Sequence, residues 1–208
     1  MTEMLLVIIK LAIRLKKPNL EGVMIMFSYK IEENLQLKLL TLQDADELYK
    51  LTINSMDHLK EWLPLIAYNK KLEDTENFIK STMKQFAENN GFQAGIWSNS
   101  KLVGVIGFHK IDWSNKSTSI GYWLGKGFEG TGIMTKACHA FVNYALTDLS
   151  LNRVEIRAAV ENTKSRSIPE RIGFFQEGRI RKAEWLYNHY VDHIVYGMLA
   201  EDWAALKK

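Results

Sequence analysis

The sequence predicts a mixed α/β fold in which one β-sheet is covered by helices. Two observations lead to this fold class. Segments with the period-two alternation of strands and segments with the apolar periodicity of helices follow each other in the order β-α-α-α-β-β-β-α-β-α-β-β. The chain has 208 residues, of which 47% are hydrophobic and 25% charged, and it contains no repeat or low-complexity tract. It therefore has the size and composition of one globular domain, with a sheet of about seven strands.

Residues 1–23 precede the predicted domain, which we assign to residues 24–208. The apolar run in this segment is interrupted by Lys10 and Arg14, so it falls short of the ~20 residues that a membrane span requires. A signal peptide is not expected either, because an acidic residue precedes the apolar run and two lysines and Pro18 follow it. The segment is an extra helix or an appended stretch of undetermined role, and no membrane contact is expected.

The first half of the domain is expected to form one strand and three helices. Residues 34–40 alternate between apolar and polar side chains, as a strand with one buried face does. Thr41 and Asp44 have the spacing of a helix-capping pair and start the first helix. Two further helices are expected at residues 56–62 and 72–89, and a glycine follows the second one.

The second half of the domain begins with three strands in succession. Short polar turns separate them, so they should pair as an antiparallel meander. The apolar face of the next helix contains Cys138, which we expect in the core. The expected ranges are, in order, strands 92–97, 102–110 and 117–124, helix 131–149, strand 152–160, helix 165–172, and strands 175–184 and 190–199.

Charge, cysteine and histidine content exclude several classes of function. The net charge of +3 is too small to argue for nucleic acid, and no direct contact with it is expected. Residues 153–182 are rich in Arg and Lys, which suits an anionic partner or a solvated surface equally well. Cys138 is the only cysteine, which excludes an internal disulfide and favours the cytoplasm. His189 and His193 are the only close histidine pair and lie in an expected strand, so no metal site is expected.

The junction between the strand at 117–124 and the following helix contains four glycines, within the stretch "GYWLGKGFEGTGIMTKA". Backbone N–H groups at such a helix start can bind phosphate, because Gly130 and Gly132 have no side chain to block an anion. The stretch is no Walker loop, since Ile133 follows its last glycine, and it matches a dinucleotide fingerprint only weakly. A tight turn without a ligand explains the glycines equally well.

A second group of polar residues follows the strand at 152–160. Asn162 and Ser165 carry amide and hydroxyl groups that can hydrogen-bond a ligand lying beside this strand. Ser165 could instead cap the next helix, and Asn162 could be a turn residue. Two consecutive strand-to-helix units with small or polar loops nevertheless suggest one ligand that spans both.

Together these segments resemble the GNAT acetyltransferase superfamily, and within it the RimJ/RimL type, which acetylates protein N-termini. The likeness spans about residues 30–203. It rests on "GYWLGKGFEGTGIMTKAC", on "NRVEIRAAVENTKSRSIPERIGFFQEGRIRKAEWL" and, more loosely, on "LKLLTLQDADELYKL". The resemblance implies acetyl-CoA as a substrate without a metal. It also implies that the fourth and fifth strands, at 117–124 and 152–160, are parallel and splay apart.

The resemblance also implies a binding site for acetyl-CoA. The superfamily loop usually reads Q/R-x-x-G-x-G/A and holds the pyrophosphate by backbone amides, whereas Gly127 occupies the leading position here. The pantetheine arm adds to the strand end like a short extra strand. Lys164 is an alternative to Arg166 for a phosphate contact. The implied residues are Trp123, Leu124, Gly125, Phe128, Glu129, Gly130, Thr131, Gly132, Ile133, Met134, Asn162, Ser165 and Arg166.

The catalytic residues implied by the resemblance are Ser165 and Glu184. Many members have, seven residues after the asparagine, a tyrosine that protonates the leaving thiolate. In this chain Pro169 occupies that position. In the RimL group, a serine in the Asn-x-x-Ser position and a glutamate in the "AEW/YL" segment are the proposed acid and base. Glu184 could also be a surface carboxylate paired with Arg181 or Lys182.

Three functions are compatible with these residues. The resemblance implies acetylation of a protein N-terminus, with a ribosomal protein that starts in Ser or Ala as acceptor. An acetyltransferase for a small amine, such as an aminoglycoside, a polyamine or an amino-acid derivative, would use the same chemistry. A CoA-binding module without turnover is a third class. The residues that select the acceptor are expected in segments 56–71 and 187–190. A homodimer is compatible with the resemblance.

Overall fold

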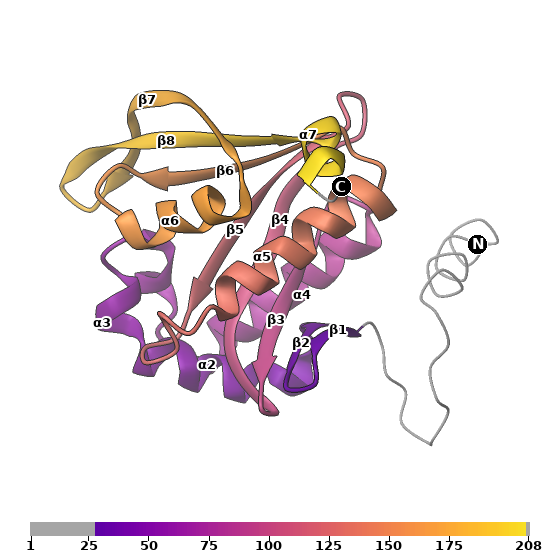
Figure 1. The fold of residues 1–208 in the computed structure, drawn as a ribbon. Coiled ribbons are helices and arrows are strands. Elements are labelled where there is room, and N and C mark those ends of the chain that lie inside the picture. Colours follow the sequence, from indigo (N-terminus) through magenta and orange to yellow (C-terminus); the bar gives the residue numbers. More distant parts are fainter. Residues whose placement is uncertain (1–27, 207–208) are drawn as a thin grey trace, which may run out of the picture.

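The computed structural model describes residues 28–206, so the predicted extension at residues 1–23 lies outside the described residues. The described chain forms one sheet with the strand order β1-β2-β3-β4-β5-β6-β8-β7 (Figure 1). Neighbouring strands are antiparallel except β5 and β6, which are parallel. The strands are β1 (Ser28–Glu32), β2 (Leu35–Leu39), β3 (Gln93–Ser98), β4 (Lys101–Asp112), β5 (Ser117–Leu124), β6 (Arg153–Ala159), β7 (Phe175–Leu186) and β8 (His189–Leu199).

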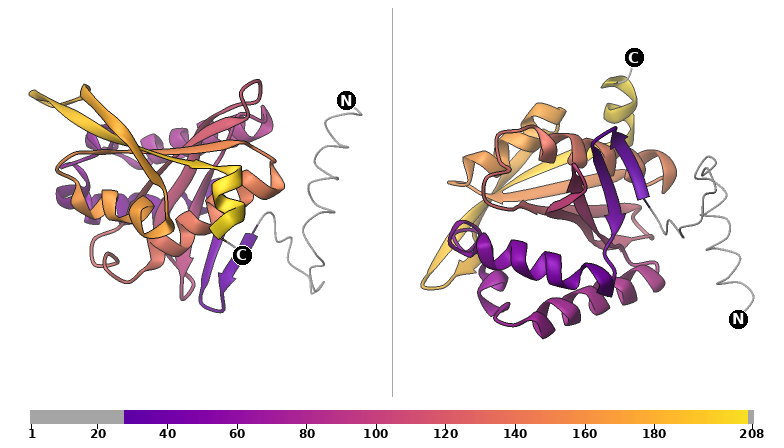
Figure 2. Two further views of the ribbon diagram at one scale, coloured as in Figure 1. Left: turned by 45° about the horizontal axis from the view of Figure 1, so that its top comes forward. Right: turned by 90° about the horizontal axis from the view of Figure 1, so that it is seen from below.

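Helices cover both faces of this sheet. The α-helices are α2 (Ala45–Asn54), α3 (Met56–Leu59), α4 (Leu72–Ala87), α5 (Ile133–Asn143), α6 (Thr163–Ile172) and α7 (Ala200–Leu206). Short turns complete the set, namely η1 (Leu42–Asp44), η2 (Pro64–Tyr68) and the π-helical η3 (Tyr144–Asp148). Helices α2 and α4 lie on one face, and α5 and α6 lie on the other (Figure 2). None of the helices in the described part is long and apolar enough to cross a membrane.

The predicted mixed sheet, its meander and its parallel pair are confirmed. The capping pair is also present, since Thr41 N donates a hydrogen bond of 2.8 Å to the carboxylate of Asp44. The structure adds two elements that the sequence did not predict, the edge strand β1 and the terminal helix α7. Strand β1 carries mostly exposed or half-buried side chains, so its sequence lacks the alternation of a strand with one buried face.

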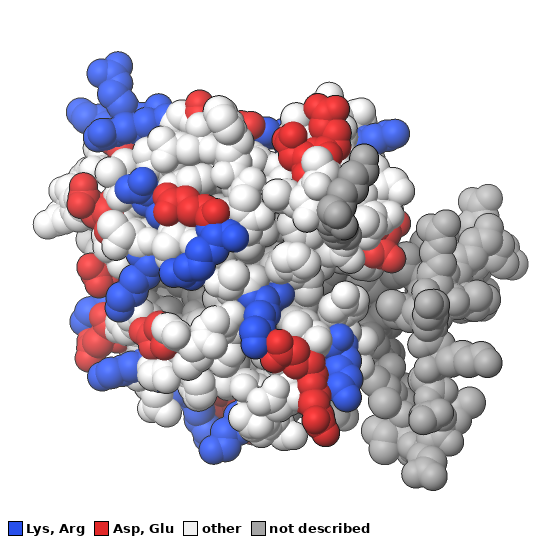
Figure 3. Space-filling model, in the orientation of Figure 1, with Lys and Arg blue, Asp and Glu red and all other residues white. Residues whose placement is uncertain are grey.

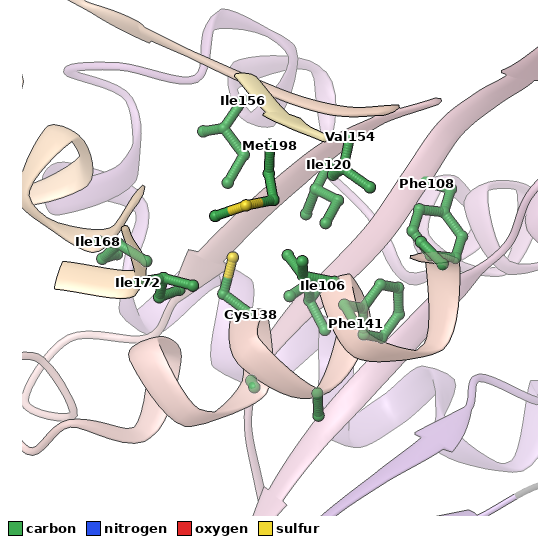
Figure 4. Close-up of a cluster of buried hydrophobic side chains, with 14 of the residues drawn as sticks. Ile106, Phe108, Ile120, Cys138, Phe141, Val154, Ile156, Ile168, Ile172 and Met198 are labelled. Atoms are coloured by element: carbon green, nitrogen blue, oxygen red, sulfur yellow. The ribbon is translucent and has the colours of Figure 1, made fainter. Parts of the chain in front are cut away.

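Two hydrophobic clusters hold the layers together. The larger cluster lies between the sheet and helices α5 and α6. The smaller lies between the sheet and helices α2 and α4. Cys138 points into the larger cluster between Ile106 and Met198 (Figure 4). Its side chain is fully buried, as predicted, and this burial raises the pKa of the thiol. The thiol therefore acts as a small core side chain.

Candidate active site

Strands β5 and β6 separate after a short shared ladder. Only Ser117, Thr118 and Ser119 of β5 pair with β6, whereas the rest of β5 stays paired with β4. Gly125 N donates to Val103 O of β4 at 2.8 Å. Because backbone groups alternate between the two edges of a strand, the N–H and C=O groups of Tyr122 and Leu124 point toward the opening. This end of β5 thus offers an unpaired strand edge, as the resemblance implied.

Three of the four glycines after β5 adopt left-handed backbone conformations. Gly127, Gly130 and Gly132 have φ values of 89°, 75° and 80°. A Cβ placed on any of them would have no atom within 4 Å, so their backbone borders open space. Gly125 differs, because a Cβ there would lie 2.4 Å from Leu51 Cδ1 of α2. We conclude that Gly125 serves packing, whereas Gly130 and Gly132 leave a bare backbone surface at the start of α5.

Helix α5 presents the amides of its first turn at this surface. Gly132 is the N-cap, and Lys136 N donates to Gly132 O at 3.1 Å. The amides of residues 133–135 precede this first helical bond and carry the positive end of the helix dipole. The Met134 side chain is buried in the core, so this predicted cofactor residue has only its backbone to offer. Backbone N–H groups of this kind fit a pyrophosphate.

Polar contacts with the segment around α3 fix the loop. Glu129 accepts a hydrogen bond of 2.8 Å from Gly127 N, and its other oxygen lies 3.0 Å from Nε2 of His58. Ser55 Oγ accepts a hydrogen bond of 2.9 Å from Lys126 N. Burial opposes the ionisation of Glu129, but hydrogen bonds from backbone amides keep its pKa below the usual value. These partners could not be predicted from the sequence, because they lie about 70 residues away along the chain.

The hydrophobic side chains predicted near the cofactor divide between the two faces of the sheet. Trp123 packs against the smaller cluster on the α2 side. Leu124, Phe128 and Ile133 pack against the larger cluster. The Thr131 hydroxyl donates to Phe128 O at 2.7 Å and braces the loop. By packing against the two core clusters, these side chains hold the end of β5 and the glycine loop on the sheet.

Asn162 and Ser165 occupy the start of α6. Asn162 Oδ1 accepts a hydrogen bond of 3.1 Å from Ser165 N, so Asn162 is the cap and the hydroxyl of Ser165 is not needed for that role. Tyr122 donates its hydroxyl hydrogen to Ser165 O at 3.0 Å, and the two hydroxyl oxygens are 3.4 Å apart. Burial raises the pKa of Tyr122, which stays protonated. Ser165 is therefore held from both neighbouring elements, β5 and α6.

Arg166 has partners within the protein. Its Nε donates to the Tyr196 hydroxyl at 3.0 Å and its Nη1 donates to Val160 O at 2.9 Å. Glu170 lies 3.8 Å from its Nη2. Contact with a phosphate stays a prediction for Arg166, and these three partners would compete with it.

Glu184 is paired with a histidine. Its Oε2 lies 3.1 Å from Nε2 of His193 on β8, whereas the neighbours considered from the sequence, Arg181 and Lys182, are not its partners among the described residues. Between Ile180 and Glu184, β7 uses four residue steps where β8 uses two, which is a bulge of two extra residues. Sequence reasoning missed His193, because this pairing depends on the bulge.

The two segments expected to select the acceptor lie side by side. The Tyr187 hydroxyl of the β7–β8 hairpin donates to Lys60 O, next to α3, at 2.7 Å. On the same hairpin, Trp185 and Tyr190 stack edge to face with ring centroids 4.8 Å apart, and both are exposed. An exposed aromatic surface thus borders the site. Within residues 28–206, no group of three or more His, Cys, Asp and Glu side chains could hold a metal ion.

Comparison with known proteins identifies the family. The acetyltransferase (GNAT) domain family matches residues 34–175. "Putative ribosomal N-acetyltransferase YdaF" of Bacillus subtilis is 40% identical over 184 residues, which cover 88% of this chain and 100% of that protein. "Ribosomal-protein-serine acetyltransferase" of Escherichia coli is 28% identical over 83% of this chain and 96% of its own length.

A solved structure extends the likeness to three dimensions. "Microcin C7 self immunity acetyltransferase MccE in complex with Acetyl-CoA and AMP" superimposes with a TM-score of 0.80 at 29% identity, and the match covers 85% of this chain and 97% of that one. The mixed sheet with its parallel β5–β6 pair agrees with the fold of this relative. The fold class and the acetyltransferase activity expected from the sequence are confirmed. The chain therefore belongs to the GNAT acetyltransferase family.

Proposed function

We propose that residues 24–208 form an enzyme that transfers the acetyl group of acetyl-CoA to the N-terminal α-amine of a ribosomal protein. One observation carries the proposal, namely that both catalytic candidates gather at the carboxyl end of β6. His193, the partner of Glu184, pairs with Ala159, the last residue of β6. Ser165 follows in the first turn of α6. The open edge of β5 and the bare start of α5 lie at the same end.

The residues present fit acetyl-CoA. The unblocked amides at Gly130, Gly132 and the first turn of α5 suit its pyrophosphate. The outward C=O groups of Tyr122 and Leu124 suit the amide N–H groups of the pantetheine arm, which binds in the manner of an added strand. The structural relative in complex with acetyl-CoA supports this assignment. Acetyl-CoA supplies the activated thioester.

In the proposed mechanism the acceptor amine attacks the thioester directly. Glu184 takes the amine proton, directly or through water, and His193 holds its carboxylate in place. The Leu124 N–H donates to the thioester oxygen, where loss of one such donor commonly costs about 3 kcal/mol. Ser165 donates a proton to the departing sulfur, and Tyr122 keeps Ser165 in position.

The names of the curated relatives support a ribosomal-protein acceptor. A protein N-terminus is a flexible chain end, which suits the exposed aromatic surface of Trp185 and Tyr190. Such an acceptor places the reaction in the cytoplasm, as the lone cysteine also suggested.

The release of free CoA thiol with a panel of acceptors tests the proposal. The panel contains peptides with N-terminal Ser or Ala, the same peptides with blocked N-termini, and small amines including an aminoglycoside and a polyamine. We expect release only with the free N-terminal peptides. Turnover with the small amines alone would show that the acceptor is a small amine and not a protein N-terminus. Tight acetyl-CoA binding without release for any amine would instead favour a non-catalytic module.

A further inference from the structure

Arg171 differs from most arginines of the described chain in its partners. It lies exposed in the last turn of α6, where Nη1 donates to Thr135 Oγ1 at 3.2 Å and Nη2 donates to Ser167 Oγ at 2.8 Å. No carboxylate of the described residues lies within 4.0 Å of its guanidinium, which is also true of Arg181. Four other arginines each have one, namely Arg153, Arg157, Arg166 and Arg179. The charge of Arg171 is thus not paired with a carboxylate of the described chain.

This charge lies between the ends of two helices. Arg171 stands in the last turn of α6, where the helix dipole favours a cation. Thr135, which accepts from Arg171, is the third residue of α5, whose first-turn amides form the positive end of the helix dipole. Basic side chains also lie over α6 beside the start of α5, with an acidic side chain among them (Figure 3). An anion between the two helices would be attracted both by the guanidinium of Arg171 and by the first-turn amides of α5.

The opposite side of the same helix start has a different charge balance. There, a pocket of about 460 Å³ is bordered by the β1–β2 and β3–β4 turns and by the loop, and it contains Lys101 and Lys136. Lys136 is already neutralised by Glu32, at 2.8 Å. Lys101 has no carboxylate of the described residues within 4.0 Å, so the α6 side is distinguished by the hydrogen bond that joins Arg171 to α5 itself.

We propose that Arg171 binds the 3′-phosphate of acetyl-CoA. The inference rests on the proposed binding of acetyl-CoA at the start of α5, where backbone amides take the pyrophosphate. Arg171 bonds the side chain of the third residue of that helix and so lies beside the amides that take the pyrophosphate, where the other phosphate of the ligand would meet it. The hydroxyl groups of Thr135 and Ser167 hold the guanidinium, whose planar fork matches phosphate oxygens.

Binding of acetyl-CoA and of 3′-dephospho-acetyl-CoA, measured by calorimetry, tests this assignment. We expect the wild type to prefer acetyl-CoA by about tenfold to hundredfold, as loss of a charged hydrogen-bonding pair predicts. Arg171→Gln should bind both compounds equally, with the affinity for the dephospho compound unchanged. Arg171→Lys, which keeps the charge, should retain part of the preference. Thermal unfolding without ligand shows whether each variant is folded.

Lys136→Gln is the matched control, because it removes a positive charge near the start of α5 on the side of the pocket, away from α6. We expect it to retain the wild-type preference. The assignment is overturned if Arg171→Gln weakens the binding of both compounds equally. It is also overturned if Lys101→Gln or Lys136→Gln removes the preference for acetyl-CoA over the dephospho compound. Failure of the proposed function is a separate result, since the wild type would then bind neither compound.

Discussion

The carboxylate of Glu184 and the imidazole of His193 meet across the β7–β8 hairpin, with Oε2 and Nε2 3.1 Å apart. The bulge in β7 contributes to this meeting. Within it, Lys182 has a φ of 50° and donates its N–H to the Asp192 carboxylate at 2.7 Å. Asp192 also binds Arg179 Nε at 2.6 Å, so the bulge is anchored from both sides. Glu184 is consequently presented on a fixed strand.

Replacing Glu184 by Gln should lower kcat strongly while leaving acetyl-CoA affinity nearly unchanged. The amide keeps the shape of the side chain but cannot accept a proton, and general-base help is typically worth about 10²–10⁴-fold. Thiol-release kinetics and calorimetry measure the two quantities. Glu177→Gln is the control on the same strand and should keep kcat. Wild-type turnover in Glu184→Gln would remove Glu184 from the mechanism.

His193 provides a second check on Glu184. If it acts by positioning the carboxylate, His193→Ala should lower kcat less than Glu184→Gln, and the double variant should be no slower than Glu184→Gln alone. His193→Gln keeps an N–H donor and should recover part of the rate. Additive losses in the double variant would show that His193 acts independently of Glu184.

Ser165→Ala should lower kcat by about 10²-fold, at the lower end of the range for acid catalysis. Its stability should barely change, because the α6 cap uses the backbone N–H of Ser165 and the side chain of Asn162. Tyr122→Phe removes a hydrogen bond worth about 1 kcal/mol and should lower kcat to a smaller extent. Steady-state kinetics and urea unfolding test both variants. A Ser165→Ala enzyme of normal rate would contradict the acid role.

Gly132→Ala should weaken acetyl-CoA binding, whereas Gly127→Ala should change it by less than about threefold. Both glycines have positive φ, so either alanine should destabilise the protein by about 1–2 kcal/mol. Only Gly132 caps α5, so only there would the methyl group face the pyrophosphate whose binding we propose. Thermal unfolding without ligand separates the shared strain from the loss of affinity. Equal affinities in the two variants would argue against a phosphate at the helix start.

The ion pair between Glu177 and Arg153 should make stability depend on pH in the acid range. The hydrogen bond from Arg153 lowers the pKa of Glu177 in the folded protein. This stabilisation is fully present above the ordinary glutamate pKa of about 4.3 and is lost as the pH falls through the lowered value. The partly exposed pair is worth about 1 kcal/mol or less. Urea unfolding should therefore separate the wild type from Glu177→Gln at pH 7, and the gap should shrink at acid pH.

The elements that the sequence predicted correctly are those set by local pattern. Strands and helices with clear periodicity appear within a few residues of their expected ranges, because alternation and helical spacing act over one turn or one pleat. The Thr41 and Asp44 pair is local in the same way. Strand β1 was missed because an edge strand need not bury a face, and α7 was missed because its sequence continues directly from β8.

Candidate site residues could be named from the sequence, but their partners within the protein could not. The glycine loop and Ser165 stand in recognisable order along the chain. The contact of Tyr122 with Ser165 joins residues 43 positions apart, and that of Arg166 with Tyr196 spans 30. Such pairs follow from the register of the sheet and the docking of α6, which no local pattern encodes. The protein acceptors of Arg166 could therefore not be predicted, and its contact with a phosphate stays a prediction.

The splayed pair of strands has a consequence for hydrogen exchange. In β5 the amides of Trp123 and Gly125 face β4, whereas those of Tyr122 and Leu124 face the opening. Consecutive amides of one strand should therefore exchange with deuterium at alternating slow and fast rates in the free protein. Binding of acetyl-CoA should slow exchange only at the fast amides. Protection at every second residue would then mark the edge of β5 that no other strand of the protein covers.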